Sequence, residues 1–326
     1  MAFPVKKIIF LFVLTNTQLF AQKQPNFTFE KEVATPKVFL QLPEFKNINV
    51  RDMAISPTND EIFFTLDAPK NAFRTILTSK KINGKWSAFT MASFSGTYHD
   101  IEPAFSPDGK QLFFASKRPI GNKKTPKKDY DLWVVTKENG EWKNPIRLPE
   151  TINTDKNEYY PSVANNGTIY FTAERSDAKG KEDIYKSELK NGTYQTPVSL
   201  GAGVNTKTYE YNAYVSPDES FIIFGSYGRK GSLGRGDLYI SFRQNDVWKE
   251  AIHLGKLINS NQIDYCPFVS FDKQYFFFTS EKSTIQPMHQ NMSMKKLKEV
   301  INEGSNGTSK IYYLSFDKLL KSLKLE

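Results

Sequence analysis

Cysteine and histidine are scarce in this 326-residue chain, which holds one cysteine, Cys266, and three histidines, His99, His253 and His289. A single cysteine cannot form a disulfide within the chain. Cys266 lies in an expected inner strand, so we interpret it as a small buried apolar residue and not as a nucleophile. A three-histidine metal site would need all three histidines, and their sequence contexts do not indicate that they meet.

Apolar runs long enough to cross a membrane as a helix are also missing. A short apolar run over 8–14 follows Lys6 and Lys7, and Ala21 places a small residue at a cleavage position. This pattern is typical of a secretory signal, and no cysteine follows it that would accept a lipid anchor. The mature chain is therefore expected to be exported, to the periplasm or the medium, without a transmembrane segment. We expect three parts: a signal peptide over 1–21, a linker over 22–35 and a single domain over 36–326.

Signature motifs of several enzyme classes are absent as well. There is no G-x-S-x-G nucleophile elbow and no accompanying hydrolase domain. Gly228, Gly231, Gly234 and Gly236 lie between two expected strands, whereas a phosphate-binding loop joins a strand to a helix. The sequence Ser-Pro-Asp-Gly at 106–109 lacks the spacing of a sialidase-type Asp box.

The chain does contain one pattern that recurs from end to end. In its clearest copy, a turn at 107–110 joins two strands, the second of which is Leu-Phe-Phe-Ala at 112–115. A third strand follows near 132–135, Asn139-Gly140 marks a hairpin, and a fourth strand ends near Leu148. Each unit is therefore predicted to be a four-stranded antiparallel meander.

Five such units are visible, with register residues 50, 58, 52 and 54 positions apart: Ser56, Ser106, Ala164, Ser216 and Ser270. A period of this length is typical of propeller blades and argues against the alternative, a β-sandwich of many short strands. We predict an all-β fold, a five-bladed β-propeller of four-stranded antiparallel blades. The last unit lacks a fourth strand, so residues 38–42 are predicted to supply it and close the ring. Short helices are expected near the C-terminus, over 292–303 and 316–325, as cover for the blades.

The units at 100–116 and 228–280 resemble the WD-like repeats of the TolB-like β-propeller family, an exported bacterial type. The ending KIYYLSFDKLLKSL resembles the terminal strand and helix of a stand-alone branch of that family. The resemblance covers roughly residues 36–320 and concerns the repeat, not an activity. It implies a binding or assembly scaffold of the cell envelope, although some relatives with this repeat are sugar-active enzymes.

Candidate site residues follow from the register, because the first strand of each blade lines the central channel. Six residues before the register position stand Val50, Asp100, Glu158, Glu210 and Asp264. Four residues before it stand Asp52, Glu102, Tyr160, Asn212 and Cys266. His99, beside Asp100, is a candidate acid or base. We predict a ligand-binding channel mouth made of Asp52, His99, Asp100, Glu102, Glu158, Tyr160, Glu210, Asn212 and Asp264.

Two interpretations of the carboxylates stay open. Each carboxylate could bond backbone amides or a serine of the adjacent blade and so hold the ring together. The four could instead gather as oxygen ligands for a divalent cation such as calcium, or form a polar funnel for a ligand. No other cofactor is indicated.

The formal charge of +9 becomes +7 once Lys6 and Lys7 leave with the signal. The lysines are scattered in loops, which is typical of a solvated face, and attraction to anionic glycans or a membrane surface is the sharper alternative. Nucleic acid is not an expected partner. The leading hypothesis is a non-enzymatic, monomeric module that binds an envelope or extracellular protein or glycan. The alternative is a carbohydrate-active hydrolase or lyase that uses the channel carboxylates.

Overall fold

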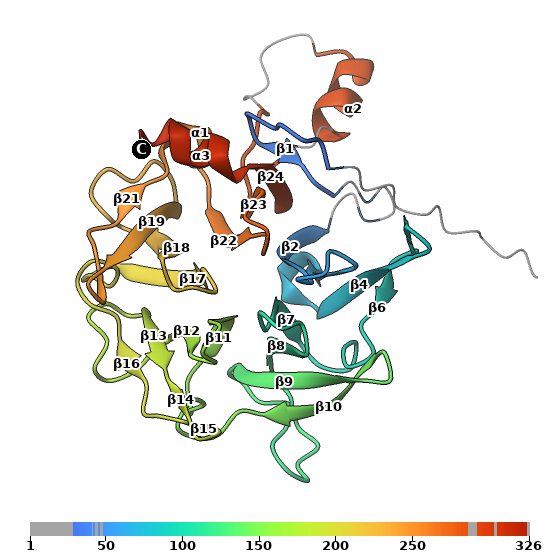
Figure 1. Cartoon of the computed structure of the whole chain (residues 1–326). Helices are drawn as coiled ribbons and strands as arrows, with labels where there is room; N and C mark the ends of the chain where they lie inside the picture. Colours follow the sequence, from blue (N-terminus) through green and yellow to red (C-terminus); the bar gives the residue numbers. More distant parts are fainter. Residues whose placement is uncertain are drawn as a thin grey trace, which may run out of the picture.

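The computed structural model describes residues 29–40, 42, 45, 48–285, 292–302 and 305–324. The predicted signal peptide over 1–21, the linker residues 22–28 and His289 lie outside the described residues. Within the described ranges the chain forms five antiparallel blades around a central axis (Figure 1), as predicted. The five first strands contact one another around that axis. The alternative of two stacked sheets is not what the chain forms.

The first three blades each run from an inner strand at the axis to an outer strand at the rim. Blade I holds β2 (Asn49–Ile55), β3 (Glu61–Asp67), β4 (Arg74–Ile82), β5 (Lys85–Trp86) and β6 (Thr90–Met91), with a short turn η2 (Pro69–Asn71) before β4. Blade II holds β7 (Asp100–Phe105), β8 (Gln111–Ser116), β9 (Asp131–Glu138) and β10 (Glu141–Arg147). Blade III holds β11 (Glu158–Val163), β12 (Ile169–Ala173), β13 (Asp183–Ser187) and β16 (Val198–Ser199), with a side hairpin of β14 (Leu189–Lys190) and β15 (Thr193–Tyr194).

The last two blades follow the same order. Blade IV holds β17 (Tyr209–Val215), β18 (Phe221–Tyr227), β19 (Asp237–Gln244), β20 (Val247–Trp248) and β21 (Ile252–His253), and the short helix α1 (Gly255–Ile258) follows it. Blade V holds β22 (Asp264–Val269), β23 (Tyr275–Ser280), β24 (Lys310–Ser315) and, at its rim, β1 (Lys37–Val38).

The ring is closed by the N-terminal strand. Strand β1 pairs antiparallel with β24, with Lys37 opposite Tyr313. The Phe39 amide extends the pairing by donating to the Ile311 carbonyl at 2.8 Å. The predicted closing strand is therefore confirmed, although it begins one residue earlier and is shorter than the predicted 38–42.

The serine turn recurs because its side chain satisfies the backbone of the next strand. Ser106 Oγ accepts a hydrogen bond from the Gln111 amide (3.0 Å) and donates to Asp108 (2.6 Å). Ser270 makes the same pair of bonds with Tyr275 and Asp272. A serine with an aspartate two residues on therefore fixes the turn between first and second strands without help from distant residues.

In blades II, III and IV, an asparagine joins the link after the outer strand to the third strand. Asn153 accepts from the Leu132 amide (2.7 Å) and donates to the carbonyls of Leu132 (3.0 Å) and Leu148 (2.9 Å). Asn205 repeats these bonds with Ile184 and Leu200, and Asn259 pairs with Leu238. A buried amide that meets its donors and acceptors is retained at low cost, which explains the repeated Ile/Val-Asn pairs in the sequence.

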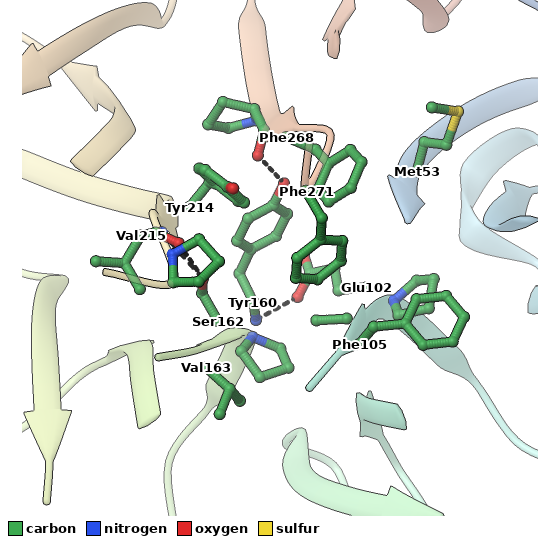
Figure 2. A pocket seen from close by; sticks show the side chains of 15 residues that line it. Met53, Glu102, Phe105, Tyr160, Ser162, Val163, Tyr214, Val215, Phe268 and Phe271 are labelled. Carbon is green, nitrogen blue, oxygen red and sulfur yellow. Dashed lines mark hydrogen bonds between the residues drawn. The ribbon is translucent and has the colours of Figure 1, made fainter. Parts of the chain in front are cut away.

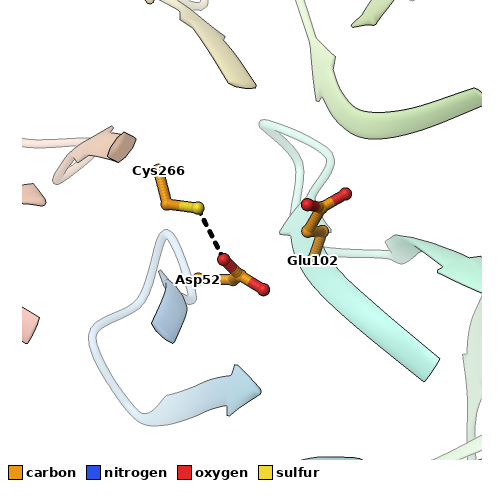
Figure 3. A group of neighbouring side chains, drawn as sticks. All are labelled: Asp52, Glu102 and Cys266. Atoms are coloured by element: carbon orange, nitrogen blue, oxygen red, sulfur yellow. Dashed lines mark hydrogen bonds between the residues drawn. The ribbon is translucent and has the colours of Figure 1, made fainter. Parts of the chain in front are cut away.

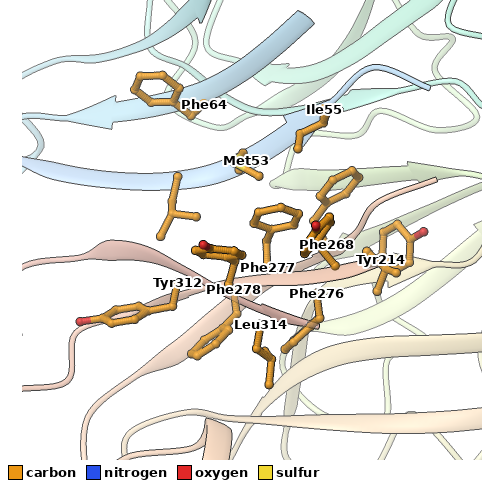
Figure 4. Close-up of a cluster of buried hydrophobic side chains, with 14 of the residues drawn as sticks. Met53, Ile55, Phe64, Tyr214, Phe268, Phe276, Phe277, Phe278, Tyr312 and Leu314 are labelled. Carbon is orange, nitrogen blue, oxygen red and sulfur yellow. The ribbon is translucent and has the colours of Figure 1, made fainter. Parts of the chain in front are cut away.

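Aromatic side chains fill the space between blades, as predicted. Figure 4 shows one such cluster, in which Phe276, Phe277 and Phe278 of β23 lie between residues of the neighbouring blades. All three are fully buried. Successive strand residues point to opposite faces, so a continuous aromatic run is expected where both faces of a blade are covered.

The two predicted C-terminal helices differ in their packing. Helix α3 (Phe316–Ser322) buries Phe316 and Leu319 against blade V, which confirms its role as cover. Helix α2 (Met294–Asn302) forms where predicted but buries none of its side chains, so the expected cover role is wrong for it. Across the described residues, no helix has both the length and the apolar character needed to cross a bilayer.

Candidate functional site

Every first strand carries the same irregularity at the same register position. The pairing of first and second strands shifts there, as between Ile101 and Ala104 of β7. The residue within each bulge has left-handed backbone, with φ values of 56° at Asp52, 61° at Glu102, 52° at Tyr160, 49° at Asn212 and 51° at Cys266. Non-glycine residues adopt this conformation rarely and at a cost. Five equivalent bulges therefore turn five side chains to the axis.

Three of the bulges are hooked to the preceding blade. In each, the bulged amide donates to a threonine hydroxyl in the second strand of the neighbouring blade. The pairs are Glu102 with Thr65 (3.1 Å), Asn212 with Thr172 (3.0 Å) and Asp52 with Thr279 (3.4 Å). These bonds satisfy amides that the bulge removes from the strand pairing.

The bulge at Tyr160 uses a different acceptor. Ala115 of β8 pairs with Ile101 at the register position that a threonine holds in blades I, III and V, so it offers no hydroxyl. The Tyr160 amide instead donates to Glu102 Oε2 at 2.7 Å. One carboxylate oxygen of Glu102 therefore has a structural role, because it replaces the missing hydroxyl.

A buried ion pair occupies the centre of the channel. Arg51 donates through Nε to Asp52 Oδ1 and through Nη2 to Glu102 Oε1, both at 2.7 Å. Cys266 Sγ lies 2.6 Å from the same Asp52 oxygen, and Asn212 Nδ2 donates to Glu102 Oε1 at 3.3 Å. Figure 3 shows Asp52, Glu102 and Cys266 facing one another across the axis. Together with the Tyr160 amide on the other Glu102 oxygen, all five blades contribute to one network.

Burial dominates the electrostatics of this network. It raises the pKa of Glu102 to about 7, with Arg51 acting in the opposite direction and Asp52 adding to the rise. Burial and the nearby Asp52 carboxylate hold the pKa of the Cys266 thiol well above its usual value. The thiol is therefore protonated at neutral pH, which agrees with the interpretation of Cys266 as a buried, unreactive residue.

The three side chains Asp52, Glu102 and Cys266 bring ligand atoms within 4.8 Å of one another. A divalent cation does not fit them, because the Arg51 guanidinium already bonds both carboxylates and a raised thiol pKa opposes thiolate formation. The Arg51 guanidinium supplies the positive charge that a metal ion would otherwise bring to these carboxylates.

Aromatic rings block the channel next to this network. The Tyr160 hydroxyl crosses from blade III and donates to the Pro267 carbonyl of blade V at 2.8 Å (Figure 2). Towards the serine turns, the remaining cavity measures about 30 Å³. It is lined mainly by apolar side chains, among them Met53, Pro103, Phe105, Tyr214, Phe268 and Phe271. That volume admits no more than a few water molecules.

The four carboxylates six residues before the register position, in contrast, do not meet at one site. Asp100 accepts from Ser116 Oγ (2.6 Å), Ser95 Oγ (2.8 Å) and Arg118 Nη2 (3.2 Å). The other three carboxylates each bond the amide and hydroxyl four residues earlier: Glu158 with Thr154, Glu210 with Thr206, and Asp264 with Ser260. All four carboxylates are fully buried. Burial raises the pKa of Glu158 to about 7.

This arrangement separates the two interpretations of the column. Each carboxylate bonds the link that leads into its own blade. Glu158, Glu210 and Asp264 accept backbone amides, as the first interpretation had it. The serines that Asp100 bonds lie in its own link and blade, and not in the adjacent blade. In the described part of the chain, the four do not group as neighbouring metal ligands. They therefore do not fit a shared calcium ion. Each one instead holds in place the loop that leads into its own blade, called here the entry loop, and we refer to these carboxylates as staples. Val50, the fifth member, donates its amide to the Ser309 carbonyl at 3.0 Å.

His99 lies half-buried at the entry to β7. Burial lowers its pKa, and the nearby Lys117 and Arg74 lower it further. The imidazole is therefore neutral at pH 7. His253, on β21, bonds Asp237 at 2.8 Å and lies in blade IV, so the two histidines do not share a site.

Sequence reasoning missed Arg51, which organises the channel centre. No other blade has a charged residue at its position, since the equivalents are Ile101, Tyr159, Tyr211 and Tyr265. The one available signal was this departure from the repeat. The sequence does show Thr65, Thr172 and Thr279 at equivalent positions near the ends of second strands. Their role could not be predicted, because it depends on the bulge in the neighbouring blade.

Comparisons with known proteins agree with the propeller fold and assign no activity or ligand. No protein-family model and no curated protein matches the chain. Similar solved structures include a glycoside hydrolase with 8% identity and a TM-score of 0.55, covering 87% of this chain and 92% of that one. A candidate TolB protein from Agrobacterium tumefaciens has 13% identity, 82% and 90% coverage and a TM-score of 0.46. An α-L-arabinofuranosidase from Lactobacillus brevis has 13% identity, 85% and 94% coverage and a TM-score of 0.46. The protein is a β-propeller module, and identities this low show the fold alone.

Proposed function

We propose that this protein is an exported, non-enzymatic propeller that binds an envelope or extracellular partner, a protein or a glycan, through loops at one end of its channel. The observation that carries the proposal is the filled channel. Tyr160 and the Arg51 network close it, and the cavity on the side of the serine turns admits only a few waters. A binding surface on the loops needs no open channel.

The state of the carboxylates supports the same conclusion. Catalytic carboxylates must reach the substrate, whereas the staples Asp100, Glu158, Glu210 and Asp264 are fully buried and bonded to their own entry loops. The resemblance of the repeat to TolB-like scaffolds and the secretory pattern at 1–21 agree with an envelope or extracellular role.

A carbohydrate-active enzyme is the second candidate, and one observation favours it. Asp52 and Glu102 present oxygens within 4.8 Å of each other, and a Glu102 pKa of about 7 suits a general acid. Retaining glycosidases place their two carboxyl groups about 5–5.5 Å apart. Against it, both side chains bond Arg51 and are only 1% and 3% exposed. A sugar ring that entered from the end with the serine turns would have to displace Tyr160 to reach them.

A binding screen combined with turnover assays separates the two candidates. Purified mature protein would be tested against glycan and envelope-protein panels, and every bound glycan would then be incubated and its products analysed. Binding without turnover is expected. Turnover that is lost in Glu102→Gln or Glu158→Gln, with the fold intact by circular dichroism, would replace the scaffold proposal by the enzyme.

A further inference from the structure

Lysines at the two ends of the propeller differ in whether they form ion pairs. On the end with the serine turns and the third-to-fourth-strand hairpins, most lysines pair with a carboxylate. Examples are Lys80 and Lys137 with Glu61, Lys143 with Glu141, Lys190 with Glu188, and Lys273 with Asp218. On the opposite end, the entry face, Lys181, Lys207 and Lys230 are exposed and have no carboxylate within 4 Å among the described residues. Their charge is therefore available to a partner.

These three lysines belong to loops that lie against one another. A Cβ added to Gly180 would fall 1.7 Å from the Thr208 carbonyl oxygen, so the chain beside Lys181 lies directly on the chain beside Lys207. A Cβ on Gly228 would come within 3.5 Å of the Thr208 side chain, which places the Lys230 loop beside the same residue. The approach at Gly180, to a backbone oxygen, leaves no room for a Cβ and therefore requires glycine.

Two tyrosines lie among these lysines. Tyr227, at the end of β18, is 50% exposed, and its ring meets Tyr209 edge-on at 6.0 Å between centroids. The Lys181 ammonium lies 6.0 Å from the centroid of the Tyr209 ring. A half-exposed tyrosine presents a flat apolar face together with a polar hydroxyl.

Tyr227 also forms one wall of an open groove between blades IV and V. The groove has a volume of about 390 Å³ and is lined by Tyr227, Arg235, Ile263 and Glu281. Arg235 bonds Glu281 (2.9 Å) and Gln262 (3.1 Å), which leaves polar edges around the aromatic wall. Its volume falls within the range of small-ligand sites.

We propose that this groove and its surroundings bind an acidic oligosaccharide, of a uronate or sulfated type. The site, called here the blade IV/V patch, consists of Lys181, Lys207, Tyr209, Tyr227, Lys230 and Arg235. A sugar ring has an apolar face that stacks on tyrosine and hydroxyls that bond polar edges, and its acidic groups meet the three unpaired ammonium groups. The inference rests on the proposed binding function and names the class of partner.

The test uses calorimetry of the mature protein with four probes. These are a uronic acid oligomer, a neutral glucose oligomer of equal length, an acidic peptide of equal charge and anionic phospholipid vesicles. The uronate is expected to bind at least about tenfold more tightly than the neutral oligomer, with affinity that falls between about 20 and 150 mM salt. Preferential binding of the peptide or the vesicles, or equal binding of the neutral oligomer, would overturn the proposal.

Variants locate the site. Tyr227→Ala is expected to weaken uronate binding about tenfold, whereas Tyr227→Phe retains it. Changing Lys181, Lys207 and Lys230 together to Gln is expected to abolish the salt dependence. A matched control removes the same charge from three exposed lysines of the turn end, with Lys81, Lys85 and Lys249 changed to Gln, and leaves binding unchanged. Equal losses in both triple variants would show a net-charge effect and reject the site. Turnover of a uronate held at this patch would instead reject the non-enzymatic function and leave the patch standing.

Discussion

The Arg51 guanidinium and the Glu102 carboxylate, which come from neighbouring blades, lie 2.7 Å apart at the centre of the channel. Both side chains are nearly inaccessible to solvent, at 11% and 2% exposure. A buried pair of this kind is costly to desolvate and more costly to break, because either partner alone leaves an uncompensated charge. Several properties of the protein should therefore depend on this pair.

Replacing Arg51 alone should destabilise the fold strongly. In Arg51→Met, Asp52 and Glu102 lose their cation, and we expect the free energy of unfolding to fall by about 3–5 kcal/mol. Urea denaturation monitored by tryptophan fluorescence measures it. Adding Glu102→Gln to Arg51→Met should recover part of the loss, and a double variant no more stable than Arg51→Met would contradict the assignment of the pair.

Stability should fall as pH rises from about 4.5 to about 7. Glu102 has a folded pKa of about 7 against an ordinary value of 4.5, so the folded state binds more protons in this window. The favourable contribution of the protonated group is complete below the unfolded pKa and lost above the folded one. The shift corresponds to at most about 3 kcal/mol.

The variant Glu102→Gln keeps an acceptor for the Tyr160 amide and removes the titration, so its stability should vary less between pH 5 and 8 than that of the wild type. Glu158, whose pKa is also raised to about 7, should contribute a slope of the same sign that Glu158→Gln removes. Chemical denaturation at both pH values compares the three proteins. A wild-type stability that increases over this range would refute the raised pKa values.

The threonine hooks should stabilise the ring of blades. Thr65→Val keeps the shape of the side chain but leaves the bulged Glu102 amide without its acceptor, and we expect a loss of about 1–3 kcal/mol. Thr65→Ser, which retains the hydroxyl, is the control and should lose less. Thermal unfolding followed by calorimetry gives the difference, and equal effects of the two substitutions would show that the hydroxyl is not the cause.

The closing strand should be a weak point of the fold. The Phe39 ring lies 5.2 Å from Phe277 and 5.6 Å from Tyr313, between centroids. Because Phe39 is only partly buried, Phe39→Ala should cost about 2 kcal/mol, below the range for a fully buried phenylalanine. Hydrogen exchange should then increase first in β1 and β24. Uniform exchange across all five blades would mean that closure is no weaker than the rest.

The repeat in the sequence determined the architecture, because turn chemistry such as Ser106 with Asp108 and aromatic strands covered on both faces act locally and recur once per blade. The missing fourth strand of the last unit also predicted the closure by residues near Val38. The channel was different. From the sequence, the residues six and four positions before the register residue were both candidates for the channel. The bulges, which depend on hydrogen bonds between blades, turn Glu102 and its equivalents to the axis. Asp100 and its equivalents instead bond the loops that lead into their own blades. The role of Arg51 and the blade IV/V patch could be recognised only in the tertiary structure, because the residues that meet there are distant in sequence. A pattern within one repeat does not specify which side chains meet across the ring.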